Sequence, residues 1–213
     1  MNDHLAVAAN DLRELAHGRR RVILGIAGPP GSGKSTVAEQ LAGLLADDGA
    51  IVVPMDGFHL ANAIIDGTPL RMRKGAIDTF DVGGYLALLT RLARNDEPVI
   101  YAPSYLRGLE EPIAASIAVP SATTFVVTEG NYLLVDEPVW SAARELMDAV
   151  WYVETPEPLR IARLIRRHVA HGMSPAGAAS WARGSDAENA RLVESTRARA
   201  DRVHRGPTGT DGN

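Results

Sequence analysis

The chain has 213 residues, of which 46% are hydrophobic and 23% charged, and these values predict one globular domain with a sizeable core. A formal net charge of −4 argues against a general nucleic-acid-binding protein, because such proteins carry a basic surface. The absence of cysteine excludes disulfides and thiolate metal sites, and the absence of an ~18-residue apolar run or a signal peptide favours a cytoplasmic protein without membrane contacts.

The first elements in chain order are a helix, a strand and a glycine-rich loop. Residues 3–17 have apolar side chains at helical spacing and predict an amphipathic helix that Gly18 ends. The arginines of 19–21 predict a solvated lead-in. Residues 21–27 form a short apolar, β-branched run, which is typical of a buried parallel strand.

The loop after this strand matches the phosphate-binding pattern G-x-x-x-x-G-K-[ST]. Its glycines allow backbone N–H groups to face phosphate oxygens, Lys34 can reach the outer phosphates, and Ser35 is placed to bind Mg²⁺. An ordinary Gly/Pro turn is the alternative, but a strand precedes the pattern and a helix with Val37 and Leu41 on one face follows it. The predicted nucleotide-binding residues are Gly28, Pro29, Pro30, Gly31, Ser32, Gly33, Lys34, Ser35 and Thr36.

The middle of the chain predicts a second strand, a variable region and a helix. Strand 50–55 ends at Asp56, and a short helical piece then leads into a basic loop. The elements expected after it are helix 82–94, a short strand 98–101, loop 103–112 and a hairpin arm 113–119.

The last part of the chain continues the alternation of strands and helices. It predicts strand 123–128, helix 138–147, strand 149–153 and helices 158–170, 175–183 and 186–199. This alternation indicates a three-layer α/β fold of the P-loop NTPase type, with a parallel sheet flanked by helices and a helical lid over about 158–185. We expect a single domain over 1–205 and a disordered tail over 206–213.

Two acids follow predicted strands and should meet the phosphate loop at one edge of the sheet. Asp56 follows the second strand and Glu129 follows strand 123–128; ligands bind at this edge in parallel α/β sheets. One acid can orient a substrate hydroxyl and the other can hold Mg²⁺ or its waters. Helix capping by Asp56 and a merely polar strand end at Glu129 are the structural alternatives. Asp136 is a rival for Glu129, but the apolar run before it is less β-branched and Gly130 and Asn131 interrupt the chain.

The 158–171 helix is rich in arginine. Arg160, Arg163 and Arg167 share one side at spacings of three and four residues, so they could close over a transferring phosphate. A solvated helix face is the alternative.

Several residues could line an acceptor pocket. His59 lies three residues after Asp56, and Tyr105 and Arg107 lie on a loop after a strand. A basic segment, Arg71–Lys74, could hold an anionic group or be an exposed loop.

Four segments together resemble the uridine kinase, pantothenate kinase and phosphoribulokinase group: Gly28–Thr36, Met55–His59, Arg73–Asp81 and Thr128–Leu134. The nearest likeness is to small bacterial nucleoside-kinase-like proteins, some of them labelled fructose transport system kinases. The resemblance implies ATP and Mg²⁺ as cosubstrates and a homodimer. It also implies Asp56 as the base, Glu129 as a second acid near the metal or the acceptor, and Arg163 and Arg167 as lid residues.

The chain departs from uridine kinases at Leu106, which stands where they have an aspartate, although Arg107 is kept. This difference puts uridine in doubt, and a nucleoside, a pantothenate-like compound or a sugar stays open as the acceptor. The sequence therefore predicts an ATP-dependent small-molecule kinase. A nucleotide-dependent regulatory NTPase without a small-molecule acceptor is the alternative, and a nucleic-acid-linked NTPase is disfavoured by the acidic charge balance.

Overall fold

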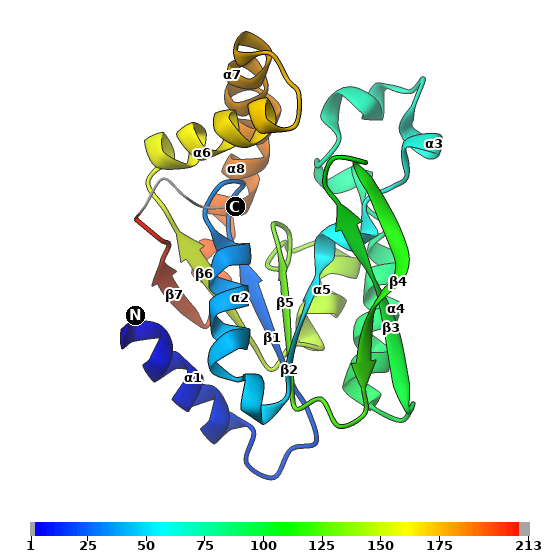
Figure 1. Ribbon diagram of the computed structural model, residues 1–213, viewed down its shortest axis with the longest axis vertical. Coiled ribbons are helices and arrows are strands. Elements are labelled where there is room, and N and C mark those ends of the chain that lie inside the picture. Colours follow the sequence, from blue (N-terminus) through cyan, green and yellow to red (C-terminus); the bar gives the residue numbers. More distant parts are fainter. Residues whose placement is uncertain (1–2, 209–213) are drawn as a thin grey trace.

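The computed structural model describes residues 3–208, in which a parallel sheet lies between two layers of helices (Figure 1). Five strands pair in parallel in the order β2-β5-β1-β6-β7. This arrangement confirms the predicted three-layer α/β fold. The strands of this main sheet are β1 Val22–Ala27, β2 Ala50–Pro54, β5 Phe125–Gly130, β6 Ala149–Glu154 and β7 Arg202–Arg205.

Helices cover both faces of the sheet because its central strands are apolar on both sides. On one face Leu24 and Val127 pack with residues of α1 (Asp3–Leu15) and α2 (Lys34–Leu44). On the other face Ile23 and Val126 pack with α4, α5 and α8. The bounds of these three helices are Val82–Arg94 for α4, Pro138–Glu145 for α5 and Ser185–Ser195 for α8.

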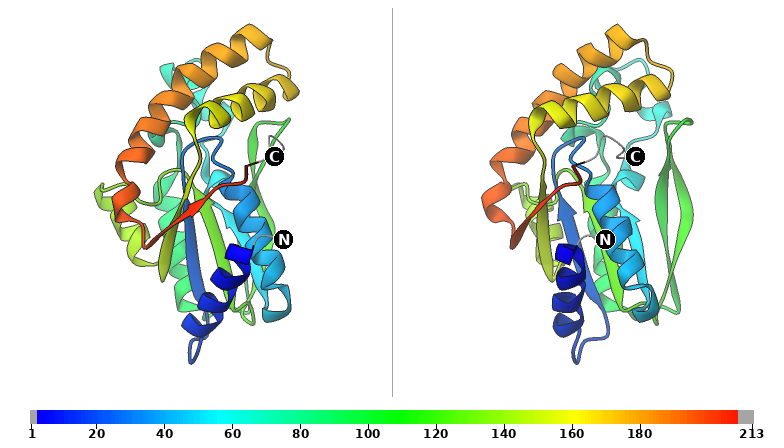
Figure 2. Two further views of the ribbon diagram at one scale, coloured as in Figure 1. Left: turned by 90° about the vertical axis from the view of Figure 1, so that its left-hand side faces the viewer. Right: turned by 60° about the vertical axis from the view of Figure 1, so that its left-hand side comes forward.

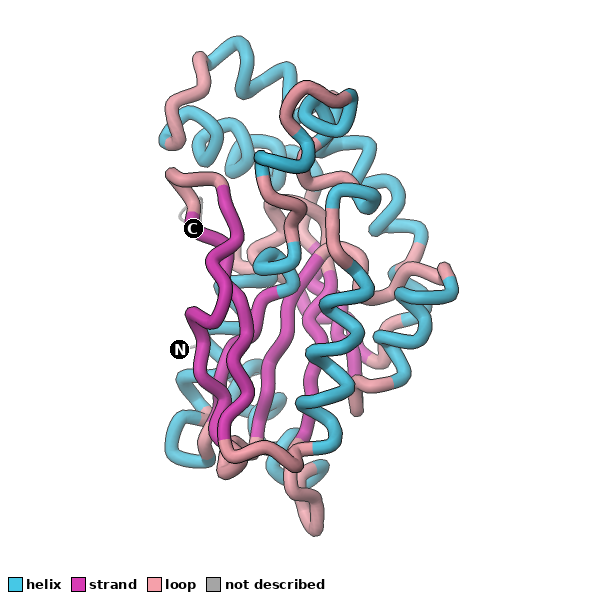
Figure 3. The backbone as a smooth tube through the Cα atoms, turned by 90° about the vertical axis from the view of Figure 1, so that its right-hand side faces the viewer, coloured by secondary structure: helices cyan, strands magenta, loops and turns pink. Residues whose placement is uncertain are grey.

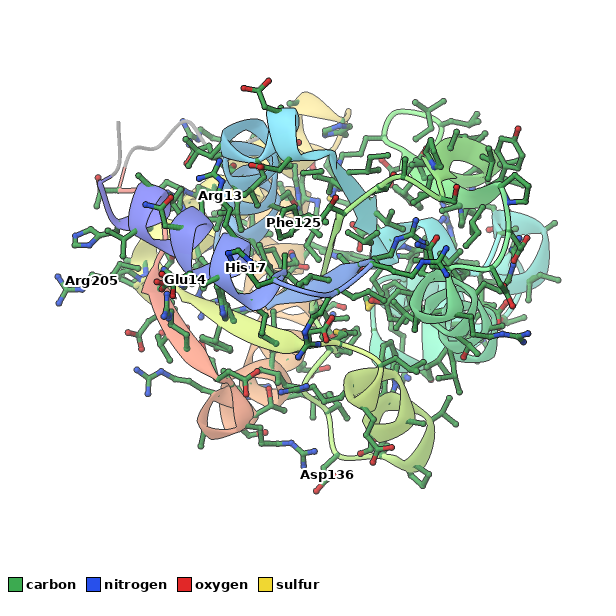
Figure 4. The ribbon with its side chains drawn as sticks, turned by 90° about the horizontal axis from the view of Figure 1, so that it is seen from below. Arg13, Glu14, His17, Phe125, Asp136 and Arg205 are labelled. Carbon is green, nitrogen blue, oxygen red and sulfur yellow. The ribbon has the colours of Figure 1, made fainter. Side chains whose placement is uncertain are left out.

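The amino ends of the strands lie at the bottom of the molecule, away from the later helices. Figure 4 views this end and shows Arg13 and Glu14 of α1, and His17 just after the helix, near the start of β5 at Phe125. Arg13 joins α1 to the end of α2, because its Nε donates to Asp48 Oδ2 at 2.9 Å and its Nη2 donates to the Leu44 carbonyl at 2.8 Å.

Two helices cross above the carboxyl ends of the strands, as the lid prediction expects. They are α6 (Glu157–Ala170) and α7 (Pro175–Arg183), and α8 then descends along the sheet (Figures 1 and 2). Ser174 caps α7 by accepting a hydrogen bond from the Gly177 amide at 3.1 Å, with Pro175 in the first turn. Among the described residues, no helix is both long and apolar enough to cross a bilayer.

A β-hairpin replaces the short strand and loop expected at 98–112. Strands β3 (Val99–Leu106) and β4 (Glu111–Pro120) pair antiparallel and stand beside the main sheet, on the side that Figure 3 faces. Pro103 led to the prediction of a loop. The register shifts between Ala102 and Ser104, and a strand can accommodate proline at such an irregularity. The hairpin arm expected at 113–119 is confirmed as part of β4.

Three smaller expectations also change: the end of the last helix, the solvation of Arg21 and the start of the tail. The last helix ends at Ser195 rather than 199, and a 3-10 turn, Arg197–Arg199, leads to β7 on the sheet edge. The predicted lead-in residue Arg21 is buried, because its guanidinium donates to three carbonyl groups at the base of the sheet, those of Leu92, Pro120 and Thr123.

The tail predicted as disordered begins inside the described region. The Gly206 amide donates to the Glu154 carbonyl at 2.8 Å, which continues the pairing of β7. Residues 209–213 lie outside the described residues.

Candidate active site

The phosphate-binding pattern occupies the turn that the sequence predicts, between the end of β1 at Ala27 and the start of α2 at Lys34. Gly31 and Gly33 have φ values of 76° and 86°, which side chains rarely permit. Side chains from neighbouring elements hydrogen-bond the loop: Thr155 Oγ1 donates to the Ser32 carbonyl at 2.8 Å, and Arg163 Nη1 donates to the Gly31 carbonyl at 3.2 Å. The loop is therefore fixed in shape.

Glu129 meets this loop because β5 lies between β2 and β1. Glu129 was predicted to follow the strand, but it lies inside β5 as its penultimate residue. It pairs with Ile26 of β1 and Pro54 of β2. Ser35 Oγ donates to Glu129 Oε1 at 3.0 Å, and Lys34 Nζ lies 3.8 Å from Oε2. Burial raises the pKa of the Glu129 carboxyl above its ordinary value, although the Lys34 charge opposes this rise.

Asp56 lies in a 3-10 turn, Met55–Phe58, directly after β2. Arg107 Nη2 donates to its Oδ2 at 3.2 Å from the hairpin side. Burial by itself would raise the pKa of Asp56, but the interaction with the His59 ring and the positive charges of Lys34, Arg107 and Arg167 outweigh burial and hold this pKa below its ordinary value. Asp56 is therefore a carboxylate at neutral pH.

The predicted acceptor residues His59 and Tyr105 have rings that contact each other next to Asp56. The His59 ring lies 4.1 Å from that of Phe80 and 4.6 Å from that of Tyr105 between centroids, and His59 Nδ1 lies 2.8 Å from the Asp56 carbonyl oxygen. Burial lowers the pKa of His59, so the ring is neutral at pH 7. The Tyr105 hydroxyl donates to Glu110 Oε2 at 2.8 Å.

Two adjoining cavities connect these residues. The Glu129 cavity, about 640 Å³, contains Ser35 and Glu129, and the Asn131 cavity, about 340 Å³, contains Lys34 and Asn131. Five residues line both cavities, so they mark the passage between them: Asp56, Tyr105, Arg107, Arg167 and His171.

The arginines of α6 have different environments although they share a helix face. Arg160 is buried and its Nη2 donates to Glu194 Oε1 at 2.5 Å. Arg163 is buried against the loop, with Nη2 donating to the Pro207 carbonyl at 2.5 Å. Only Arg167 of the three lies in both cavities, and its guanidinium has no hydrogen bond or ion pair within residues 3–208. Burial and the charge of Arg107 lower the pKa of Arg167, and a bound anion would relieve both effects.

The basic segment Arg71–Lys74 is largely engaged with protein atoms. Lys74 Nζ donates to Asn62 Oδ1 at 2.6 Å and to the Glu110 carbonyl at 2.5 Å, and Arg71 Nη1 donates to Asn62 Oδ1 at 2.8 Å. Arg73 pairs with Asp78 on the surface. These pairings argue against an anion site at this segment and favour the alternative of a basic loop, although its side chains contact protein atoms.

The rival acid Asp136 lines neither of the two cavities, and its contacts are with other residues. Its carboxyl pairs with Arg199 and accepts from Ser141 Oγ at 3.0 Å, its side chain is 73% exposed, and in Figure 4 it points outward at the edge of the molecule. The preference for Glu129 over Asp136 therefore agrees with the geometry.

The Asn131 cavity also contains polar residues to which the sequence analysis gave no role. His168 Nε2 lies 2.7 Å from Asp186 Oδ2, and Asn131 and Asn189 line the same cavity. An acid in the first turn of a helix is typical of dipole compensation, so Asp186 gave no signal of its own. Asn131 follows Glu129 by two residues and lies in the Thr128–Leu134 segment that carries the family resemblance, and these were its available signals.

Comparison with known proteins agrees with this geometry. The family described as Phosphoribulokinase / Uridine kinase matches residues 23–180. A Schizosaccharomyces pombe protein provisionally named a uridine kinase is 33% identical over 75% of this chain and 72% of its own length. The uncharacterized Escherichia coli protein YggC is 31% identical over 82% of this chain and 73% of its own. A crystal structure from Silicibacter sp. TM1040, provisionally described as a fructose transport system kinase, superposes with a TM-score of 0.83 at 35% identity, covering 94% of this chain and 98% of that one.

These matches, with the loop and the sheet order, define a P-loop kinase. The chain belongs to the phosphoribulokinase / uridine kinase family.

Proposed function

We propose that this protein transfers the γ-phosphoryl group of Mg·ATP to a hydroxyl group of a small molecule. One observation carries the proposal: Lys34, Ser35, Glu129 and Asp56 converge on a divided cleft that also contains Arg167. A regulatory NTPase would have no need of a carboxylate that faces a second cavity. The acceptor class stays open among nucleosides, pantothenate-like compounds and sugars, and the homodimer and the cytoplasmic location stay predictions.

In this proposal each charged group has one task. Lys34 and Arg167 stabilise negative charge on the transferring phosphoryl oxygens from opposite sides of the cleft. Asp56 orients the acceptor hydroxyl and takes up its proton, and Arg107 fixes the carboxylate through their 3.2 Å hydrogen bond. Arg163, predicted as a catalytic lid residue, is better suited to positioning, because it donates to the Gly31 and Pro207 carbonyls.

The donor set near the loop fits Mg²⁺. Glu129 Oε2 is buried and has no hydrogen-bond partner in the described part of the chain, and Ser35 adds a hydroxyl oxygen. No group of three His, Cys, Asp or Glu side chains among residues 3–208 could hold a metal by itself. That pattern suits Mg²⁺, which keeps waters and substrate phosphates as ligands and, when bound, neutralises charge on phosphate oxygens.

A screen of ADP release tests the proposal. The protein is incubated with Mg·ATP and a panel of nucleosides, vitamins and sugars, and any product is checked by mass for one added phosphoryl group. We expect at least one compound to stimulate ADP release, and we expect Lys34→Ala to weaken both nucleotide binding and turnover. ATP hydrolysis that no compound stimulates would contradict the kinase proposal and favour the regulatory NTPase.

A further inference from the structure

A third cavity lies outside the cleft, beside the start of the lid helix α6. Its volume is about 660 Å³, and the end of β6, the first turn of α6, the end of α8 and the segment after β7 enclose it. Figures 1 and 2 show the ends of β6 and β7 next to the start of α6. Among the described residues, none that lines this cavity also lines the Glu129 cavity or the Asn131 cavity. We call it the Tyr152 cavity, and its size suits a small-molecule ligand.

Tyr152 presents an unpaired hydroxyl group to this cavity. Its residue surface is only 2% exposed, and it lies on the face of β6 that packs towards α8. No residue within 3–208 forms a hydrogen bond with the hydroxyl, yet it is not one of the unpaired side-chain atoms that are sealed from solvent. The hydroxyl therefore faces the open space of the cavity. Burial raises the pKa of Tyr152 to about 12, so this group keeps its proton and can donate it to a ligand.

The Tyr152 cavity also contains a positive charge without a partner. β7 pairs Arg205 with Glu154, so both side chains lie on the cavity side of the sheet. Glu154 is paired with Arg197 at 3.0 Å, and the other lining carboxylate, Glu194, accepts from Arg160 at 2.5 Å. The Arg205 side chain has neither a hydrogen bond nor an ion pair in the part of the chain that the structure describes, and it points outward in Figure 4. An anionic group is therefore the ligand group that this cavity favours.

Apolar side chains cover much of the remaining wall. Leu159 and Pro156 contribute from the start of α6, and Pro207 contributes from the segment after β7. A flat ring can pack against this surface while an anionic group on the ring reaches the Tyr152 hydroxyl and Arg205.

Two walls of the Tyr152 cavity also hold the phosphate loop. Thr155 lines the cavity, and its hydroxyl donates to the Ser32 carbonyl at 2.8 Å. Pro207 lines it as well, and its carbonyl accepts from Arg163, which also donates to the Gly31 carbonyl. A ligand that shifts or stiffens either wall therefore acts on the loop that binds phosphate.

We propose that the Tyr152 cavity is an effector site for a small anion that carries a flat apolar ring, and that its occupancy changes the affinity of the phosphate loop for nucleotide. The anionic group contacts the Tyr152 hydroxyl and Arg205, and the ring packs on Leu159 and the two prolines. The ligand is neither phosphoryl donor nor acceptor, because its cavity lies outside the cleft where those two meet.

Ring compounds of matched size and different charge test the binding. Benzoate and phenylphosphonate are compared with benzyl alcohol and benzylamine in ligand-observed NMR titrations of the full chain, with Mg²⁺ and a saturating non-hydrolysable ATP analogue in the cleft. We expect the anions to bind with Kd values of ~1 mM, as suits ligands of this size, and the alcohol and amine to bind at least about tenfold more weakly.

Variants locate the binding. Tyr152→Phe and Arg205→Gln should each weaken anion binding roughly tenfold, whereas Arg20→Gln, an exposed arginine before β1, should bind like the wild type. Tyr152→Phe removes no hydrogen bond, so its thermal midpoint without ligand should equal or exceed that of the wild type. The site is refuted if neither anion binds, if the alcohol and amine bind as well as the anions, or if both cavity variants bind the anions like the wild type.

Nucleotide titrations at rising anion concentration test the effector role. We expect the Kd of the ATP analogue to change roughly fivefold and then to level off as the cavity fills. A change that keeps growing with the anion concentration would show competition for one site, and no change at all would refute the effector role. ADP release with an acceptor decides the kinase function separately, because none of these titrations needs turnover.

Discussion

Replacing Asp56 by asparagine removes one negative charge from the cleft and keeps the shape of the side chain. The Arg107 hydrogen bond at 3.2 Å can still form to the amide oxygen, whereas proton acceptance is lost. A positioned base contributes ~10²–10⁴-fold, so we expect kcat to fall by that factor, or about 2.7–5.5 kcal/mol of barrier. The KM for ATP should stay the same or decrease, because Lys34 and Arg167 then face the phosphates without a competing carboxylate.

The assay is steady-state ADP release with the acceptor that the screen identifies, together with nucleotide titration to separate binding from chemistry. Because its folded-state pKa lies below the ordinary value, ionised Asp56 stabilises the fold at pH 7, and the asparagine variant should unfold at a slightly lower temperature. Asp136→Asn is the matched control, since Asp136 is exposed and pairs with Arg199. Wild-type kcat in Asp56→Asn, or an equal loss in Asp136→Asn, would refute Asp56 as the base.

Three further predictions concern the loop, the lid and the turn that carries Asp56. Because its pKa is raised, Glu129 should bind a proton first on acidification, so Mg²⁺-dependent nucleotide affinity should fall from pH 7.5 towards pH 5 in the wild type. Glu129→Gln should lack this dependence, and parallel curves for the two proteins would contradict the assignment. Arg163→Met should lower the free energy of unfolding by about 1.5–3 kcal/mol in denaturant titrations, whereas Arg167→Met should mainly lower kcat; the reverse pattern would exchange their roles. Gly57→Ala should lower the free energy of unfolding by about 1–3 kcal/mol, because its Cβ would lie 2.4 Å from the Pro103 carbonyl oxygen. The control Gly43→Ala meets no atom within 4 Å and should be neutral or stabilising. Equal thermal midpoints of the two variants would argue against this close approach.

The sequence predicted the main sheet and the nucleotide side of the cleft well, because both depend on local patterns. Apolar runs and the glycine-lysine loop specify strands and a helix start, and the rule for parallel sheets then brings Glu129 and Asp56 to Lys34. The hairpin was missed because Pro103 argues against a strand until a register shift accommodates it.

The different environments of the arginines could not be predicted, because they depend on contacts between distant parts of the chain. Arg21, Arg163 and Arg167 have the same side chain, but Arg21 binds carbonyls at the base of the sheet and Arg163 binds the phosphate loop. Only Arg167 has its guanidinium in the cleft without a hydrogen bond or ion pair among the described residues. Helical spacing places Arg163 and Arg167 on one face, but it does not show which of the two side chains will hydrogen-bond the phosphate loop.

The register of β5 links the two halves of the cleft. Side chains alternate along a strand, so Glu129 points to the same face as Val127, towards the start of α2, while Thr128 points to the opposite face. There the Thr128 hydroxyl bonds the Tyr85 hydroxyl at 2.7 Å, inside the core. A slip of one residue would bury Glu129 against Tyr85 and remove the acid from Ser35.

The same register determines where Asn131 begins its turn, two residues beyond Glu129. One strand and the turn after it therefore position both Glu129 in the Glu129 cavity and Asn131 in the Asn131 cavity. Their relative placement does not depend on the position of the lid. The lid helix α6 contributes to both cavities, with Arg167 lining each of them and His168, bonded to Asp186, lining the Asn131 cavity. Because Arg167 and His168 are consecutive on α6, and His168 Nε2 lies 2.7 Å from Asp186 Oδ2, a movement of this helix towards a bound nucleotide would also move this part of the Asn131 cavity wall. Nucleotide binding and acceptor binding are thus expected to be coupled through α6, and a saturating ATP analogue should tighten the binding of the acceptor that the screen identifies more in the wild type than in Asp186→Asn.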